Sequence, residues 1–443
     1  MPTSIQQFNV SSTGCLRGHS SASGNEGRPA LKSSLAVVLG LYILKEGFEY
    51  LLQYLNLVYL KRYGLIVPPE FHGEIDETLL RKMRDYEVEK TRFSFVSSLF
   101  GVLVAVVFFF GGLLNFYNSW IASLNLPFVP AGLVFALLLS YASTVISIPF
   151  SIYSTFRIEN KHGFNTMTPK LWLADFGKSL IVSTVMTGIV VSVGLWLIEF
   201  SPNYWWVWVW GFFLLFSIFM MYIAPYVIEP LFNKFTPIGD PGLEEKIKDI
   251  MAKINIRVSR VFKMDASKRS RHTNAYFSGI GRVKRIILYD TLLQSMTREE
   301  ILGVLAHEAG HWKKKHVLKM IVAAEVLSFI GIYISFRILQ TDFLADLFRI
   351  ENGTFFAKAL VLGFLGGILS LPFTPVSSYI SRKFEKEADR FACELTGNRE
   401  AIAGTLIKLS KDNLSSLHPH PLYAAFYYSH PPVVERVREI RSL

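Results

Sequence analysis

Two histidines four residues apart, His307 and His311, are the side chains of this sequence with the clearest capacity for chemistry. On an α-helix such a pair lies on one face, one turn apart, so both imidazoles can reach the same metal ion. Glu308 faces the same region without being a ligand. This HExxH pattern is typical of zinc held by two histidines, with the glutamate as the catalytic base. It predicts one Zn²⁺ per chain, and two histidines on an ordinary helix are the less favoured alternative.

A catalytic zinc ion needs a third protein ligand and an open coordination position. The stretch 381–395 places Glu385 and Asp389 one helical turn apart on one side. Glu385 is the candidate ligand, and Asp389 would orient a ligating histidine through a hydrogen bond. Glu387 competes for the ligand role, and charge-rich helical stretches are often only solvated surfaces. The residues alone therefore leave the third ligand open.

The HExxH residues need a helix to present them, and the sequence predicts one. Thr297 and Glu300 form a capping-box pattern at its start, and Leu302, Leu305 and Ala306 supply an apolar stripe after it. The preceding segment is predicted to be helical over 242–256 and strand-like over 258–265, 274–279 and 284–290, with Gly279 and Gly281 in the turn between the last two strands. The motif thus belongs to a mixed α+β segment.

The composition places this segment beside a membrane. Of the 443 residues, 51% are hydrophobic and only 18% are charged, which is typical of a polytopic α-helical membrane protein. Crossing the hydrocarbon core takes about 20 apolar residues in a helix. About seven runs reach this length: 34–60, 93–116, 131–156, 174–199, 204–228, 317–339 and 354–376. Pro372 and Pro375 should bend or end the last run.

The positions of lysine and arginine predict how these runs are oriented. Two connections, 116–130 and 199–203, contain neither residue. The connections on the other face are rich in both: 61–92, 157–170, 229–316 and 381–443. The positive-inside rule therefore places the N-terminus outside and the C-terminus in the cytoplasm. This distribution accounts for most of the net charge of +11, so we expect the lipid bilayer as a partner and no nucleic acid.

Charged residues also occur inside the apolar runs, at Lys45, Glu46, Glu49 and Glu325. Ionisable groups at that depth should face the interior of the helix bundle or water. They indicate either an ion pair between Lys45 and Glu49 in a packed bundle or a hydrated internal space. Composition alone leaves both open.

Two motifs together, "HEAGHW" and "FEKEAD", resemble the membrane-embedded HExxH…ExxAD zinc peptidases. A narrower resemblance, to the type I CaaX prenyl proteases, rests on four further stretches: "RIENKHGFNTMTPKLWLADFGKS" at 157–179, "PLFNKFTPI" at 230–238, "RSRHTNAYFSGIGRVKRIILYDTLL" at 269–293 and "YYSHPPVVERV" at 427–437. The resemblance covers residues 35–440, which is everything except the N-terminal tail.

The resemblance implies seven transmembrane helices around a large water-filled chamber, with a cytoplasmic α+β zincin-like (gluzincin) catalytic domain. It assigns the third zinc ligand to Glu385 and places His430 as a catalytic group at the scissile carbonyl, where an imidazole can stabilise an oxyanion. Asn274 and Arg436 are implied to bind substrate, Asn274 beside an edge strand that pairs with the substrate backbone. The implied function is removal of the C-terminal tripeptide from prenylated CaaX proteins.

The resulting organisation has five parts. A Ser/Gly-rich tail, expected to be disordered, covers 1–32, and the first five spans with their loops cover 33–228. A cytoplasmic block with the HExxH helix covers 229–316, the last two spans cover 317–380, and a second cytoplasmic block covers 381–443. Five other histidines are expected at the surface or at helix caps: His162, His272, His316, His418 and His420.

Two rival functions stay open. A membrane quality-control zinc protease would cut its peptide or protein substrate without requiring a prenyl group. A non-catalytic transporter or scaffold would use the internal charges as a pathway, although the sequence has no inverted repeat. The compartment depends on the source: the cell membrane if prokaryotic, and the endoplasmic reticulum membrane if eukaryotic.

Overall fold

The computed structural model describes residues 27–278 and 283–443 of the chain. Most of the tail predicted over 1–32 lies outside these residues. Helix α1 begins at Gly27, however, so residues 27–32 are helical and the tail prediction is wrong there. The turn predicted around Gly279 and Gly281 also lies outside the described residues.

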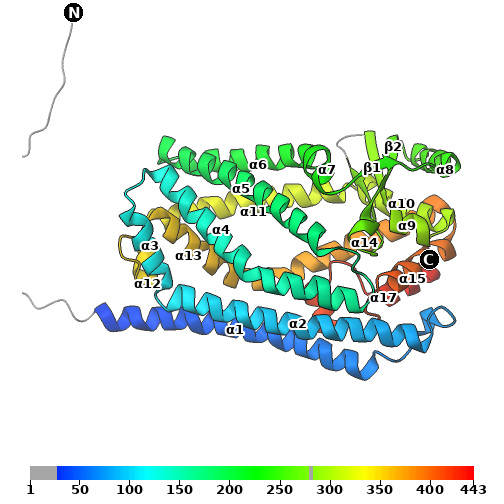
Figure 1. Cartoon of the computed structure of the whole chain (residues 1–443), viewed down its shortest axis with the longest axis horizontal. Helices are drawn as coiled ribbons and strands as arrows, with labels where there is room; N and C mark the ends of the chain where they lie inside the picture. The colour runs from blue at the N-terminus through cyan, green and yellow to red at the C-terminus, as the bar shows by residue number, and fades with distance from the viewer. Residues whose placement is uncertain (1–26, 279–282) are drawn as a thin grey trace, which may run out of the picture.

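Helices make up most of the described chain. Those before the sheet are α1 (Gly27–Tyr63), α2 (Glu77–Phe110), α3 (Leu113–Ser123), α4 (Phe128–Tyr153), α5 (Pro169–Phe200), α6 (Trp205–Ile223) and α7 (Glu229–Phe232). The others are α8 (Pro241–Ala252), α9 (Asp290–Ser295), α10 (Arg298–Lys313), α11 (His316–Leu339), α12 (Phe343–Phe348), α13 (Phe355–Leu369), α14 (Thr374–Thr396), α15 (Arg399–Asp412), α16 (Pro421–Tyr427) and α17 (Val433–Ser442). In Figure 1 the sheet, α8 to α10, α15 and α17 gather at one end, and the long helices extend from there toward the other.

Five helical segments of the described chain are long and apolar enough to cross a membrane: Glu77–Phe110, Phe128–Glu159, Pro169–Phe200, Trp205–Phe232 and His316–Leu339. A sixth span arises if α13 and α14 count as one, since this pair is bent by 44°. The bend falls at Pro372 and Pro375, as predicted, because proline lacks the N–H that would continue the helix. The chain is a helical membrane protein, with five or six such apolar helices in its described part.

The first predicted span corresponds to α1, which is helical but is not one of these apolar segments. Its centre carries Lys45, Glu46 and Glu49. Lys45 Nζ lies 3.0 Å from Glu49 Oε1 and 2.9 Å from Glu46 Oε1, so the predicted ion pair is present and has a second partner. The count of seven spans therefore stays a prediction, because it depends on whether this charged helix crosses the membrane.

The small sheet positions one end of the site. Its strands in the described residues are β1 (Phe235–Pro237), β2 (Arg257–Met264), β3 (Ala275–Ser278) and β4 (Val283–Tyr289), in the order β1-β2-β4-β3. Strands β2 and β4 are parallel, and the two outer strands run antiparallel to their neighbours. The three predicted strands are confirmed, and the helix predicted over 242–256 is confirmed as far as Ala252. Strand β1 was not predicted, because it is too short to show an alternating pattern. Strand β3 lies at an edge of the sheet.

A buried cluster joins this sheet to the helix that carries the HExxH motif. Ile286 and Leu288 of β4 pack with Ile247 and Met251 of α8 and with Leu305 of α10. Burial of each such side chain contributes about 1.5–3 kcal/mol to folding. The cluster therefore holds α10 firmly against the sheet.

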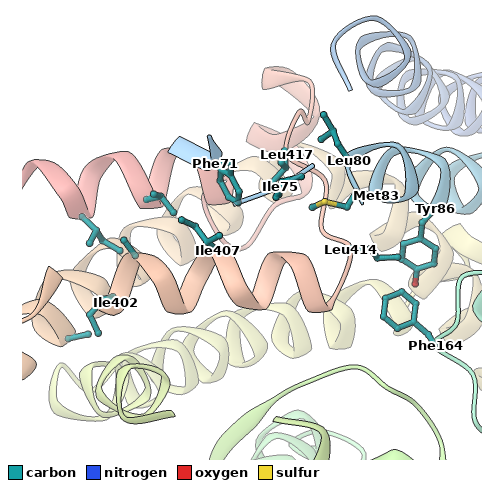
Figure 2. Close-up of a cluster of buried hydrophobic side chains, with 14 of the residues drawn as sticks. Phe71, Ile75, Leu80, Met83, Tyr86, Phe164, Ile402, Ile407, Leu414 and Leu417 are labelled. Atoms are coloured by element: carbon teal, nitrogen blue, oxygen red, sulfur yellow. The ribbon is translucent and has the colours of Figure 1, made fainter. Parts of the chain in front are cut away.

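A second buried cluster, drawn in Figure 2, joins the start of α2 to the C-terminal helices. Phe71, Leu80 and Met83 pack with Ile407 at α15 and with Leu414 just after it. These residues are more than 300 positions apart in the sequence. The C-terminal segments are thus anchored to the cytoplasmic-side end predicted for the first two long helices.

Candidate metal centre

Helix α10 presents the two histidines of the HExxH motif. The predicted capping box is confirmed: the backbone N–H of Glu300 donates to Thr297 Oγ1, and the backbone N–H of Thr297 donates to Glu300 Oε2 at 2.8 Å. Three turns later His307 and His311 share one face, while Ala306 on the neighbouring face is fully buried in the core. Local capping and core packing together set the direction in which both imidazoles point.

Helix α14 presents the acidic residues against α10. Its buried face includes Glu385, Ala388 and Asp389, as the helical spacing predicted. The two helices approach closely where Gly310 meets Ala388: a Cβ added to Gly310 would lie 2.9 Å from the Ala388 Cα atom and 3.0 Å from its carbonyl oxygen. The absence of a side chain at Gly310 is what allows Glu385 to reach the histidines.

His307, His311 and Glu385 come together at this crossing. Glu385 Oε2 lies 3.3 Å from His307 Nε2, Glu385 Oε1 lies 3.2 Å from His311 Nε2, and the two Nε2 atoms are 3.1 Å apart. One donor atom from each residue falls within a group no more than 4.8 Å across. Two imidazole nitrogens and a carboxylate are the donor set of many catalytic zinc sites.

The surroundings of Glu385 fit a metal ion as well. Its side chain is buried, and among the described residues its Oε2 atom has no hydrogen-bonding partner. A buried carboxylate oxygen without a partner is costly, and a bound cation would satisfy it. The residues present therefore fit a zinc ion held by two histidines and one glutamate.

Asp389 and Arg436 lie next to Nδ1 of His307. Asp389 Oδ1 lies 2.7 Å from His307 Nδ1, so the carboxylate can hold this ring with Nε2 facing Glu385. Arg436 binds Asp389 in a bidentate manner, at 2.7 Å from Nε to Oδ2 and 2.6 Å from Nη2 to Oδ1. The Arg436 side chain is only 10% exposed and also lies 3.6 Å from Glu385. Arg436 thus contacts the acidic residues of α14 and also His307, whose Nδ1 atom lies 3.4 Å from its Nη2 atom. Its predicted role in substrate binding stays a prediction.

The other two candidate residues lie on different sides of this centre. His430 Nε2 is 3.3 Å from Glu385 Oε1, and the His430 side chain is 60% exposed, so it borders the accessible side. Asn274 directly precedes the edge strand β3, and its main-chain oxygen accepts a hydrogen bond from the N–H of Tyr289. The structure thus brings His430 to the candidate ligands and Asn274 to the sheet edge, and the roles predicted for both remain to be tested.

Glu308 differs from its acidic neighbours because its carboxylate forms no hydrogen bond with another described residue. Burial raises the pKa of this carboxyl group, while nearby His307 and His311 act in the opposite direction. A carboxylate whose pKa is shifted toward neutrality can accept a proton and return it during one reaction cycle. Its surroundings therefore suit the base predicted from the sequence.

Sequence reasoning missed the contact between two residues beside this centre, His316 and Glu387. His316 was expected at the surface or at a cap, but its side chain is only 1% exposed, and its ring contacts both His311 and Glu387. Glu387, the rival for the ligand role, points to His316 and belongs to no three-residue metal group in the described chain. Helical spacing gave no signal, because Lys314 and Lys315 break the helix between His311 and His316.

The other histidine predictions had mixed outcomes. His162 is also buried, with 6% of its side chain exposed and Nε2 2.8 Å from Glu89, so the surface prediction is wrong for it. His420 caps α16 by accepting a hydrogen bond from the N–H of Leu422, which confirms the capping prediction there.

Replacement of Gly310 by alanine should weaken metal binding. The added Cβ would overlap Ala388, so α10 and α14 must separate, at an expected cost of about 1–3 kcal/mol in the free energy of unfolding. The separation would also pull Glu385 away from the histidines. Thermal unfolding and metal content by mass spectrometry would measure both effects. Gly404→Ala in α15 is the matched control, because nothing lies within 4 Å of its added Cβ. An unchanged melting temperature and metal content in Gly310→Ala would contradict the close-packing argument.

Comparisons with known proteins agree over nearly the whole chain. Residues 56–234 match a family described as CAAX prenyl protease N-terminal, five membrane helices, and residues 237–443 match peptidase family M48. The CAAX prenyl protease 1 homolog of Arabidopsis thaliana is 34% identical, over 92% of this chain and 97% of that protein. CAAX prenyl protease 1 of Saccharomyces cerevisiae is 32% identical, over 90% of this chain and 94% of that protein.

A solved structure gives the same result. The crystal structure of S. mikatae Ste24p superimposes with a TM-score of 0.85 at 31% sequence identity, covering 92% of this chain and 99% of that chain. Membership of family M48 implies a bound metal, for which this chain has a fitting donor set, and a peptide or protein as substrate. The chain therefore belongs to the CAAX prenyl proteases of peptidase family M48, and it is an integral-membrane metalloendopeptidase.

Proposed function

We propose that this enzyme is a zinc endopeptidase that removes the C-terminal tripeptide of prenylated CaaX proteins. The observation that carries the proposal is the meeting of His307, His311 and Glu385, with Glu308 beside them and His430 on the accessible side. The names of its relatives support the substrate class. One Zn²⁺ per chain would be held by the two histidines and Glu385, with a position left open for the reaction.

The reaction is peptide-bond hydrolysis. A zinc ion bound here supplies Lewis acidity, which makes water easier to deprotonate and a carbonyl easier to attack. Glu308 takes the proton of the attacking water and later delivers it to the leaving amine. His430 donates a hydrogen bond to the oxyanion that develops on the scissile carbonyl. Asp389 keeps His307 in the tautomer whose Nε2 lone pair faces the centre.

The substrate would bind in an extended conformation along β3. An edge strand offers unpaired main-chain groups that can form a ladder with a peptide. Strand β3 is at the sheet edge and packs beside α10, so a peptide added there would pass the HExxH helix. Asn274 at the start of this strand, and Arg436 near the centre, are the side chains proposed to contact the substrate.

For the membrane arrangement we propose seven spans around an internal chamber that ends at the zinc site. The charged α1 would be the additional span, with Lys45, Glu46 and Glu49 facing the chamber rather than lipid. The sheet region and the C-terminal block would lie in the cytoplasm and the N-terminus outside, as the lysine and arginine distribution indicates. The host membrane would be the endoplasmic reticulum in a eukaryote or the cell membrane in a prokaryote.

The decisive experiment uses purified enzyme in lipid and two CaaX peptides that differ only at the cysteine. One cysteine carries a farnesyl group and the other a methyl group. We expect loss of the last three residues from the farnesylated peptide, at a rate at least about tenfold higher than for the methylated one, because the isoprenoid adds a large apolar surface for binding. Mass spectrometry of the fragments identifies the bond that is cut.

The remaining outcomes separate the rival functions. Equal cleavage of both peptides would favour a membrane quality-control protease without a prenyl requirement. Cleavage at other bonds only would refute the proposed register. Membership of a metalloendopeptidase family already disfavours a non-catalytic transporter or scaffold.

A further inference from the structure

The histidine that begins α11, His316, lies directly behind the zinc site. Its Nδ1 atom is 3.1 Å from Nδ1 of His311, and its Nε2 atom is 3.0 Å from Oε2 of Glu387. Its side chain is 1% exposed, and its ring stacks on Phe384 with the centroids 4.2 Å apart and the planes 7° apart. A buried imidazole so closely held on three sides has one fixed orientation.

We propose that Glu387, His316 and His311 form a hydrogen-bonded chain that positions His311 as a zinc ligand. In this chain His316 and Glu387 are positioning residues, which act through His311 and touch neither the metal nor the substrate. The proposal rests on the zinc site of the proposed function, but it concerns metal binding and is independent of which peptide is cut.

The direction of the hydrogen bonds follows from the ligand atom. His311 turns Nε2 toward His307 and Glu385, so this nitrogen must keep its lone pair free for the metal. The ring proton of neutral His311 is therefore on Nδ1, and it is donated to Nδ1 of His316. His316 in turn has its proton on Nε2 and donates it to the Glu387 carboxylate. The donor and acceptor atoms of all three groups are then fixed, and His311 is held as the tautomer with its proton on Nδ1.

The arrangement parallels that of the first ligand. His307 is backed by Asp389 at 2.7 Å, directly from α14. His311 is backed by Glu387, also from α14, but through one intervening imidazole. Helix α14 thus supplies a ligand between the rings and a carboxylate behind each of them. A hydrogen bond from a carboxylate to a ligating histidine raises its basicity and holds its ring plane, and its loss typically costs about 10–100-fold in metal affinity.

The chain also connects the zinc site to the membrane segment. His316 is the first residue of α11, a candidate span, and Lys315 before it adopts a left-handed conformation with φ of 57°. This left-handed turn brings the first residue of α11 into contact with His311. The position of a metal ligand is therefore coupled to the start of a span.

Three substitutions test the proposal by zinc affinity, measured by chelator competition on the full-length protein in lipid. His316→Phe keeps the ring and the stacking on Phe384 but removes both nitrogens, and we expect zinc binding about 10–100-fold weaker. His316→Asn retains an oxygen that can accept from His311 Nδ1, so it should restore most of the affinity. Glu387→Gln keeps an acceptor without the charge and should produce a smaller loss than His316→Phe.

The matched control is His162→Phe, which removes another buried histidine bound to a glutamate, away from the metal centre. It should leave zinc affinity unchanged even if it lowers the melting temperature. The absorption spectrum of the Co²⁺-substituted protein gives a second readout, because its ligand-field bands should shift in His316→Phe and not in His162→Phe.

Two results would overturn the proposal. One is His316→Phe with the zinc affinity and Co²⁺ spectrum of the parent. The other is His316→Asn binding zinc as weakly as His316→Phe, which would assign the effect to packing. If His316→Phe fails to fold, the other two variants decide: His316→Asn near the parental zinc affinity together with a weaker Glu387→Gln supports the proposal, and parental zinc affinity in Glu387→Gln overturns it. Failure of the parent to cut a prenylated peptide would refute the proposed function alone, since the affinity measurements need no substrate.

Discussion

Replacement of Glu308 by glutamine is expected to reduce peptide cleavage by about 10²–10⁴-fold, the usual contribution of a general acid–base residue. Glutamine has nearly the same shape but cannot accept a proton from water. Glu308 forms no hydrogen bond with the other described residues, so its loss should disturb neither the ion pairs nor the packing of α10. The variant should therefore keep its metal and its melting temperature while its turnover number falls.

The measurement is cleavage rate together with zinc content on the same preparation. Glu299→Gln is the matched control, because Glu299 lies on α10 with 68% of its side chain exposed and, among the described residues, pairs only with Lys246 at the surface. We expect this control to cleave at the parental rate. If Glu308→Gln cut peptides as fast as the parent, a different group would have to move the proton.

Replacement of Glu385 by alanine is expected to remove both the metal and the activity. Glu385 is buried between the Nε2 atoms of the two histidines, and no other carboxylate of the described chain joins them in a three-residue metal group. Two histidines alone leave the site one protein ligand short of the usual catalytic set. Zinc content after dialysis against a chelator should fall from about one per chain to near zero, with cleavage at background.

The control for this variant is Glu394→Ala, since Glu394 lies on the same helix with an exposed side chain. It should keep its zinc. Added zinc should also raise the melting temperature of the parent and of Glu394→Ala, but not of Glu385→Ala, because only a protein that binds the ion in its folded state is stabilised by it. A Glu385→Ala protein that still held one zinc per chain would show that the third ligand lies elsewhere.

Local features of the fold were predictable from short stretches of sequence. The capping box at Thr297, the strands β3 and β4, and the bend at Pro372 and Pro375 all depend on residues within a few positions of one another. The i,i+4 pairing of Lys45 with Glu49 is of the same kind. Such features follow from backbone geometry and hydrogen bonding over one or two turns, which act in the same way wherever the segment is placed.

The number of membrane-spanning helices does not follow from the hydropathy of each run alone. Six of the seven predicted runs correspond to apolar segments or to the bent pair of helices in the described chain, but the run at 34–60 forms a helix with three ionisable residues at its centre. Whether such a helix crosses lipid depends on what covers those charges. The neighbouring helices determine how these charges are covered, and the hydropathy of the run itself does not predict it.

The sequence by itself determined the chemistry available to this protein: two histidines and a glutamate on one helical face, and an acidic helix that could supply a third ligand. Only the tertiary structure shows which acid lies against the two histidines, because Glu385 and Glu387 differ by their direction around α14 and not by their type. The choice follows from the contact of Gly310 with Ala388, which turns Glu385 toward the histidines and leaves Glu387 facing His316. Contacts between residues about 80 positions apart come from the packing of whole helices, and no local pattern encodes their rotation.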